Sequence, residues 1–235
     1  MKYPFRRIEK IEKRENIGAY GVWRREFCKE YRELLIRTRN NSYNSLFETL
    51  TAKGEMITCR KRCTYCCYHY VAVPLAQGMV IVDYLYQRKG ALQKFICNYE
   101  KWHHTGHDIS NIIDHVRTQA LASGKPIERV IALTRPLAMH YLEMDIPCPF
   151  LVNNTCLIYD VRPLPCSGQY SVSPPHWCAP ATAGEPVIHQ LIPDEKDLYE
   201  MMQLAGPQFM LYELTLPLMI YKLLTEGAAS LIKND

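Results

Sequence analysis

Apolar residues recur at helical spacing along most of the chain, and this pattern predicts a mainly α fold. The first stripe predicts a helix to about Arg39; its apolar positions are Tyr20, Trp23, Phe27, Tyr31, Leu34 and Leu35. The polar run at residues 40–42 is expected to break this helix and to cap a second one. We expect that second helix to run to about Ala52 and to end at Gly54.

The middle of the chain repeats the helical pattern between glycines and prolines, which mark helix ends. It predicts helices at about residues 74–88, 91–102, 108–121 and from 126 onward. The run His103–His107 is expected to form a turn, because Gly106 opposes a regular helix and Asp108 can cap the next one. Pro136 is expected to kink or divide the last of these helices.

Residues 144–185 are rich in proline, and we expect loops with short strands there rather than helices. Asp194 then predicts the start of a helix that Gly206 stops, and an apolar helix at about 209–224, bent at Pro217, closes the chain. Neither sustained alternation with a period of two nor a repeating strand–helix–strand rhythm is visible. The predicted fold is therefore a mainly α domain with an irregular cysteine-rich metal-binding layer between or on the helices.

With 48% hydrophobic and 22% charged residues among 235, the chain has the composition of a globular protein, and we expect residues 1–235 to form a single domain. Residues 1–40 hold 12 Lys and Arg against 6 Glu, about +6, so the remainder of a net +4 chain carries about −2. We expect this basic helical N-terminal region to be a solvated face, because its charges alternate. A nucleic-acid partner is not expected, whereas a protein partner or substrate stays open.

The first 16 residues contain no apolar core of the kind that a secretory signal needs. The most apolar segment, residues 209–224, is short for a bilayer span and contains Glu213, Pro217 and Lys222, so no membrane contact is expected. A cytoplasmic location is therefore expected. In a reducing cytosol, clustered cysteines are expected to hold metal or carry out redox chemistry rather than to form disulfides.

Eight of the ten cysteines fall in two regions, and these are the candidate metal ligands: Cys59, Cys63, Cys66 and Cys67, then Cys148, Cys156, Cys166 and Cys178. Thiolates are the soft ligands that zinc and iron–sulfur clusters prefer. We therefore predict that zinc or an iron–sulfur cluster is held between the two regions, with residues 59–178 as the cysteine-cluster core. Cys28 and Cys97 lie outside both regions and are expected to be dispensable for metal.

The surroundings of these cysteines suit metal binding. Two residues separate Cys63 from Cys66, a spacing that lets a loop curl around one ion. Adjacent side chains diverge, so Cys66 and Cys67 can serve two metals, or one of them can be structural. Prolines stiffen the second region and reduce the entropy lost on ordering it. Nearby basic residues offset thiolate charge; these are Arg60, Lys61, Arg62 and Arg162.

Two signatures resemble the CxxCxxCC cysteine-cluster family, a YkgJ-like zinc- or iron-chelating domain that includes relatives of flagellin lysine N-methylase. They are Cys-x3-Cys-x2-Cys-Cys at residues 59–67 and Cys-Pro-Phe-Leu … Cys-x-Ile-Tyr-x-x-Arg-Pro-x-x-Cys at residues 148–166. The resemblance implies seven ligands, namely Cys59, Cys63, Cys66, Cys67, Cys148, Cys156 and Cys166. Cys178 is added for its position beside them, and the spacing from Cys59 to Cys63 is one residue longer than the family's.

Several functions remain compatible with these motifs. The leading hypothesis is a metal-binding protein with an electron-transfer or cluster-dependent role, and a structural zinc module is the next. The resemblance also implies a protein lysine N-methyltransferase using S-adenosylmethionine, although the chain contains no Gly-x-Gly turn for such a cofactor. The spacing from Cys59 to Cys66 also matches the radical S-adenosylmethionine motif, which normally follows the first strand of a barrel.

The histidines are weaker candidates. His103, His104 and His107 cluster in sequence, but we expect them to be polar residues of a turn between helices. His69 and His176 lie beside the cysteine regions, and we expect them to flank the ligands or to lie at the surface.

Overall fold

The structure is a computed structural model that describes residues 19–60, 62–179 and 184–232. Of the predicted basic N-terminal region, residues 1–18 lie outside these ranges. The described chain is mainly α, as the apolar pattern predicts. Its helices are α2 (Ala19–Ala52), α3 (Leu75–Tyr86), α4 (Lys89–Ala122), α5 (Ile127–Glu143), α6 (Leu164–Ser167), α7 (Glu195–Ala205), α8 (Pro207–Leu211), α9 (Leu216–Thr225) and α10 (Ala228–Ile232).

The strands that the structure describes pair in three small antiparallel sheets. These are β1 (Ala72–Pro74) with β6 (Glu213–Thr215), β2 (Leu151–Val152) with β3 (Thr155–Cys156), and β4 (Gln169–Ser171) with β5 (Ile188–Gln190). Short 3-10 helices complete the irregular part, namely η1 (Tyr65–Tyr68), η2 (Tyr159–Val161) and η3 (Pro175–Cys178). The described part of residues 144–185 thus contains the loops and short strands that its proline content predicts, but also the short helix α6, which the prediction excluded.

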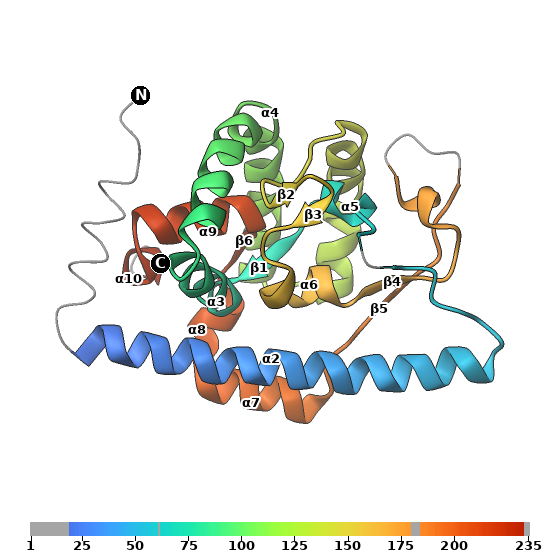
Figure 1. The fold of residues 1–235 in the computed structure, drawn as a ribbon, viewed down its shortest axis with the longest axis horizontal. Helices are drawn as coiled ribbons and strands as arrows, with labels where there is room; N and C mark the ends of the chain where they lie inside the picture. The colour runs from blue at the N-terminus through green and yellow to red at the C-terminus, as the bar shows by residue number, and fades with distance from the viewer. Residues whose placement is uncertain (1–18, 61, 180–183, 233–235) are drawn as a thin grey trace.

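Helices α3 and α9 pack against each other in the hydrophobic core (Figure 1). A Cβ at Gly78 of α3 would lie 2.7 Å from Met219 Cγ and 2.8 Å from Leu223 Cδ1, so glycine lets the two helices approach closely. The sheet β1–β6 leads directly into both helices, and Val73 pairs with Leu214 in it. Segments about 140 residues apart in sequence are therefore joined where α3 and α9 begin.

Helix α2 is continuous, so the predicted break at residues 40–42 is wrong. Four residues of the predicted apolar stripe, Phe27, Tyr31, Leu34 and Leu35, face the core, and the helix ends at the predicted glycine, Gly54, with φ 71°. Polar residues lower helix propensity by only a few tenths of a kcal/mol each, which tertiary contacts can outweigh. Here Ser42 Oγ donates to Ile192 O at 3.3 Å, and the rings of Tyr43 and Tyr170 lie 5.2 Å apart.

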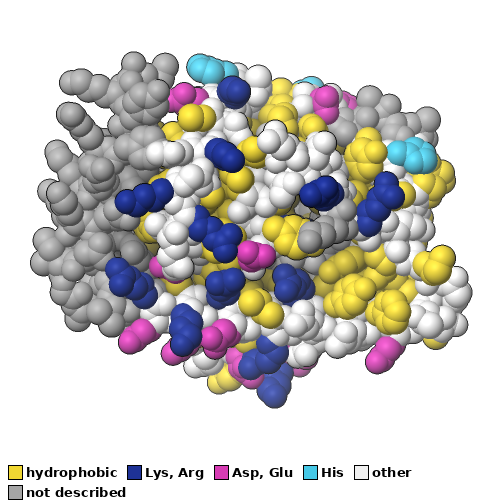
Figure 2. All heavy atoms as spheres, viewed as in Figure 1, with side chains coloured by type: hydrophobic (Ala, Val, Ile, Leu, Met, Phe, Trp, Pro, Cys, Tyr) yellow, Lys and Arg dark blue, Asp and Glu magenta, His cyan; other side chains and the backbone are white. Residues whose placement is uncertain are grey.

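The exposed side of α2 carries charges of both signs and pairs with α7, which runs alongside it (Figure 1). Arg37 forms ion pairs with Glu200 and, at 3.5 Å, with Asp197. On the face shown in Figure 2, Lys and Arg side chains are scattered among acidic and apolar ones. This arrangement agrees with the solvated, mixed-charge face that the sequence predicts for the described part of the N-terminal region.

Helix α4 is also continuous, and the predicted turn at His103–His107 is wrong. Position 106 inside this helix is a glycine because the Trp102 side chain leaves no room for a Cβ, which would lie 2.7 Å from Trp102 Nε1. That indole N–H donates to Tyr141 Oη on α5 at 2.8 Å, so the glycine belongs to the α4–α5 contact. Asp108 consequently sits in mid-helix and caps nothing.

Other helix ends lie where the sequence places them. Gly124 ends α4 with φ 71°, Pro126 precedes α5, and the Asp194 carboxylate accepts the Asp197 N–H at 2.7 Å to cap α7. Helix α5 runs through Pro136, so of the predicted kink or division the structure excludes the division.

The predicted closing helix at residues 209–224 is instead divided into α8, β6 and α9, because β6 pairs with β1. Pro217 lies in the first turn of α9, where proline is tolerated, and therefore does not bend the helix. Among the described residues, no helix combines the length and the apolar character that crossing a membrane requires.

A buried carboxylate fastens α4 to the junction of β6 and α9. Asp114 accepts the Thr215 N–H at 2.9 and 3.0 Å and the Tyr70 hydroxyl at 2.5 Å. Burial raises the pKa of Asp114 from 3.8 to about 6, although these hydrogen bonds favour the charged form. Thr215 lines the cavity described below, so this contact also positions its wall.

Asp114 should give the protein a measurable pH dependence. The native carboxyl binds its proton more tightly than the unfolded chain does, so the free energy of unfolding should fall as pH rises from about 4 to about 6. The fall should reach about 3 kcal/mol, and Asp114→Asn should remove it. Urea unfolding at several pH values measures the difference between the two proteins. The fully exposed Asp108 on the same helix supplies the control, Asp108→Asn; parallel profiles of native protein and Asp114→Asn would contradict the assignment.

Candidate metal centre

The first cysteine region is a loop that β4 holds in place. The Thr58 N–H and hydroxyl both donate to Ser171 O, at 2.8 and 2.9 Å. Arg62 adopts a left-handed conformation with φ 71°, which costs a non-glycine residue on the order of 1 kcal/mol. Helix η1 follows at once and carries the adjacent residues Cys66 and Cys67. The loop is therefore tied at one end and sharply turned before its last two thiols.

The second region begins directly against the first. The Cys148 N–H donates to Cys67 O at 2.8 Å, which joins two residues 81 positions apart. The carbonyl of the next residue, Pro149, accepts a hydrogen bond from Asn98 Nδ2 of α4 at 3.0 Å. Phe150 is fully buried and stacks on Phe95 of α4, with ring centroids 4.5 Å apart. The helical core thus fixes the position of Cys148.

A tight hairpin brings the next thiol back beside this point. Asn153 and Asn154 both have positive φ, 48° and 55°, and form the two-residue turn between β2 and β3. Such turns favour asparagine because it tolerates left-handed backbone. The hairpin places Cys156 opposite Leu151.

Helix α6 supplies the third thiol of this region, Cys166. Pro163 precedes the helix, and its carbonyl accepts the Cys166 N–H at 2.9 Å. The Leu164 N–H donates to Gln77 Oε1 of α3 at 2.9 Å, which ties the start of α6 to the core. Helix α3, which follows β1 directly, therefore also holds the helix that carries Cys166.

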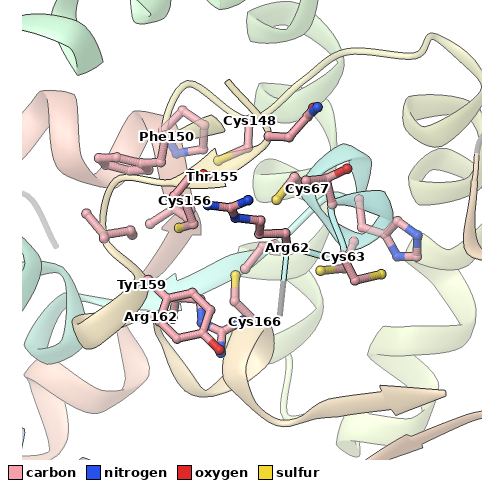
Figure 3. Close-up of a pocket in the computed structure, with 18 of the residues that line it drawn as sticks. Arg62, Cys63, Cys67, Cys148, Phe150, Thr155, Cys156, Tyr159, Arg162 and Cys166 are labelled. Atoms are coloured by element: carbon pink, nitrogen blue, oxygen red, sulfur yellow. The ribbon is translucent and has the colours of Figure 1, made fainter. Parts of the chain in front are cut away.

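Thiols from the two regions line one cavity of about 310 Å³, which we call cavity A (Figure 3). Its cysteines are Cys63, Cys66, Cys67, Cys148, Cys156 and Cys166. Apolar side chains make much of the remaining wall; these are Val71, Tyr141, Phe150, Ile158, Leu216 and Pro217. The two predicted cysteine regions are thus brought together at a partly enclosed, largely apolar site.

A second space of about 190 Å³, cavity B, adjoins cavity A and shares part of its lining. Its cysteines are Cys59, Cys63, Cys66, Cys166 and Cys178. Cys59 Sγ accepts the Ser171 N–H at 3.1 Å, and Cys178 ends η3, which packs against η1. His69 lines both cavities, and its Nε2 lies 3.4 Å from Cys178 O. Cys178, included in the prediction only for its position, therefore does lie with the other thiols.

The thiols differ in acidity. Burial raises the pKa of Cys148 to about 12 and that of Cys166 well above its usual value. The thiol of Cys67 donates to Cys66; this lowers the pKa of Cys66 to about 7 and raises that of Cys67. Most of these groups therefore carry a proton in the absence of a cation, and binding a metal would release protons.

Two guanidinium groups face the thiols. Arg162 lines both cavities and stacks on Tyr159 at 4.1 Å. Its buried Nε has no hydrogen-bond partner within the part of the chain that the structure describes. Arg62 reaches into cavity A between Cys67 and Cys156 (Figure 3). Nearby positive charge lowers the cost of ionising thiols. Arg162 adds to the Cys67 hydrogen bond in lowering the pKa of Cys66, and it offsets part of the rise that burial causes in the pKa of Cys156.

The donor chemistry of the site fits zinc or an iron–sulfur cluster, because all eight predicted ligands are thiols outside any disulfide. The geometry is that of a lined cavity rather than of a preformed centre. Within residues 19–60, 62–179 and 184–232, no three Cys, His, Asp or Glu side chains are grouped closely enough to hold a metal ion as they stand. Binding would therefore require the sulfurs to draw inward and the Arg62 side chain to move aside.

The two other cysteines and the histidine cluster of α4 lie away from both cavities. Cys28 is buried in the core and Cys97 is exposed on α4, and neither lines cavity A or B. The rings of His103 and His107 stack at 4.2 Å on one face of α4.

Burial lowers the pKa of His69, which keeps this imidazole neutral beside the thiols.

Sequence reasoning missed the C-terminal wall of cavity A, formed by Thr215, Leu216 and Pro217. Thr215 ends β6, the other two residues follow it, and all three reach the cavity because β6 pairs with β1. No motif around them signals a site, since their role depends on a pairing between segments about 140 residues apart in sequence.

No family model, curated protein or solved structure matches the chain. The likeness to the CxxCxxCC cysteine-cluster family therefore rests on the motifs at residues 59–67 and 148–166.

The fold bears on one enzymatic alternative. A radical S-adenosylmethionine motif belongs at the first strand of a parallel barrel, whereas the described residues form three antiparallel two-stranded sheets. In addition, cavity B places Cys178 beside Cys59, Cys63 and Cys66, where that chemistry needs an iron without a fourth protein ligand. The protein lysine N-methyltransferase stays a prediction.

Proposed function

We propose that this chain is a metal-binding protein that holds zinc or an iron–sulfur cluster through its two cysteine regions. One observation carries the proposal: thiols from residues 63–67 and 148–166 line the same cavity. A backbone hydrogen bond from Cys148 to Cys67 joins the regions at that point.

The residues around cavity A support such a role. Arg62 and Arg162 offset the negative charge that several thiolates would create. Phe150, Ile158 and Leu216 limit the access of water, which tunes the potential and the lability of a thiolate-bound metal. When bound, an iron–sulfur cluster would supply electron transfer or a cluster-dependent activity, whereas zinc would supply structure.

The decisive measurement is metal and acid-labile sulfide content on protein purified without oxygen, together with its absorption spectrum. Iron with sulfide and visible charge-transfer absorption would establish the iron–sulfur form and justify reductive titration. Stoichiometric zinc in colourless protein would establish the structural form and remove electron transfer. Protein that contains no metal and has its thiols paired would contradict the proposal.

A further inference from the structure

Two cavities, rather than one, meet at the first cysteine loop. Cys67, Cys148 and Cys156 line only cavity A, whereas Cys59 and Cys178 line only cavity B. The three remaining thiols line both; these are Cys63, Cys66 and Cys166. The eight thiols therefore do not surround a single point.

The neighbours of each shared thiol divide the set further. Cys166 interacts electrostatically with Cys148 and Cys156, which belong to cavity A. Cys63 acts on Cys59 and on Cys178, which belong to cavity B.

Cys66 interacts with thiols of both groups. It accepts the Cys67 hydrogen bond and acts on Cys148, Cys156 and Cys166 of cavity A, and it also acts on Cys59 and Cys178 of cavity B. Assigning Cys66 to cavity B gives each cavity four thiols, the number that a closed tetrahedral site requires.

We propose that cavity B is a second, separate metal site, in which Cys59, Cys63, Cys66 and Cys178 bind one tetrahedral thiophilic cation such as Zn²⁺. Cavity A then keeps Cys67, Cys148, Cys156 and Cys166 as its own set. This inference rests on the proposed metal-binding function and goes beyond it by assigning each thiol to one of two sites.

The surroundings of cavity B support a binding site. The Ser171 N–H donates to Cys59 Sγ at 3.1 Å, a contact that orients the sulfur and favours its thiolate. Thr58 fixes the start of the loop on the same strand through Ser171 O. At the other end, η3 packs against η1, which brings Cys178 to the loop.

Arg162 explains how two anionic groups can lie side by side. Its guanidinium lines both cavities, and its buried Nε has no hydrogen-bond partner among the described residues. A four-thiolate site holding a divalent cation carries a charge of about −2, so a cation between two such sites reduces their repulsion.

Cobalt(II) titration of anaerobic, metal-free protein tests the inference, because thiolate ligation gives Co²⁺ an intense absorption that reports each filled site. The native protein should bind two equivalents. The double variant Cys59→Ser and Cys178→Ser should bind one and keep its helical circular dichroism, since both residues lie outside the core. Cys148→Ser with Cys156→Ser should also bind one, and Cys97→Ser should bind two.

The outcomes separate the two proposals. Native protein that binds one equivalent would keep the metal-binding function and overturn the second site. Loss of both equivalents in the Cys59→Ser and Cys178→Ser variant would show one shared cluster, and retention of both would show that these thiols are not ligands; either result overturns the assignment. Native protein that binds no cobalt and contains no metal as purified would overturn both proposals.

Discussion

Removing the metal is expected to strip residues 151–178 of most of their hydrogen-exchange protection while α3 and α9 stay protected. This segment contains the two-residue strands β2 and β3, the three-residue strand β4, the four-residue helix α6 and short 3-10 helices. Elements of this length are not stable alone. Under the proposed function, thiols at 156, 166 and 178 tie the segment to the rest of the chain, so most of its stability would come from the metal. Structural zinc contributes on the order of 10 kcal/mol to small domains.

Hydrogen exchange followed by mass spectrometry, with and without a chelator and in the absence of oxygen, measures this effect peptide by peptide. Cys97→Ser is the matched control, because Cys97 is exposed on α4 and should leave both the metal content and the chelator response unchanged. An equal loss of protection in α3 and α9 would show that the metal holds the whole fold. Unchanged protection throughout would show that the segment does not depend on metal.

Phe150→Ala is expected to lower the free energy of unfolding by about 3–5 kcal/mol, because it removes a fully buried ring and leaves a cavity. Phe150 is 1% exposed and stacks on Phe95 at an interplanar angle of 15°. It also lines cavity A two residues after Cys148, so its loss should loosen that thiol and weaken metal binding at least tenfold. Denaturant unfolding and a competitive chelator titration measure the two effects.

Two further variants make this test specific. Phe47→Ala removes the same ring from a position that is 52% exposed, and it should change stability by less than about 1 kcal/mol. Phe150→Leu keeps most of the apolar volume and loses the ring stacking, so it should cost about 1–2 kcal/mol. A Phe150→Ala protein as stable as Phe47→Ala would show that the ring does not anchor the second cysteine region.

Helix ends were predicted best where a single residue decides the backbone. Gly54, Gly124 and Gly206 have positive φ, and Asp194 caps α7 with its own side chain. These effects act within one turn of helix, so the local sequence contains the whole cause. The buried stripe of α2 was predicted for the same reason, because helical periodicity is itself a local property.

Helix interiors were predicted less well, because contacts from other segments decide them. Gly106 signals a break in sequence, yet it allows Trp102 to pack and to donate to Tyr141 of α5. The polar residues at 40–42 signal another break, yet Ser42 and its neighbours contact residues more than a hundred positions later. Intrinsic propensities of a few tenths of a kcal/mol cannot compete with such contacts.

For this protein, the sequence by itself determined the mainly α class, the ends of several helices and which eight thiols to consider as ligands. Only the tertiary structure decided that these thiols line two adjoining cavities, and that β6 brings Thr215 and Pro217 to one of them. The physical reason is the separation along the chain over which each effect acts. Periodicity and capping act over a few residues, whereas a cavity depends on pairings between distant segments, such as Cys148 with Cys67 and β1 with β6. Those pairings depend on how the whole core packs, which no stretch of sequence contains alone.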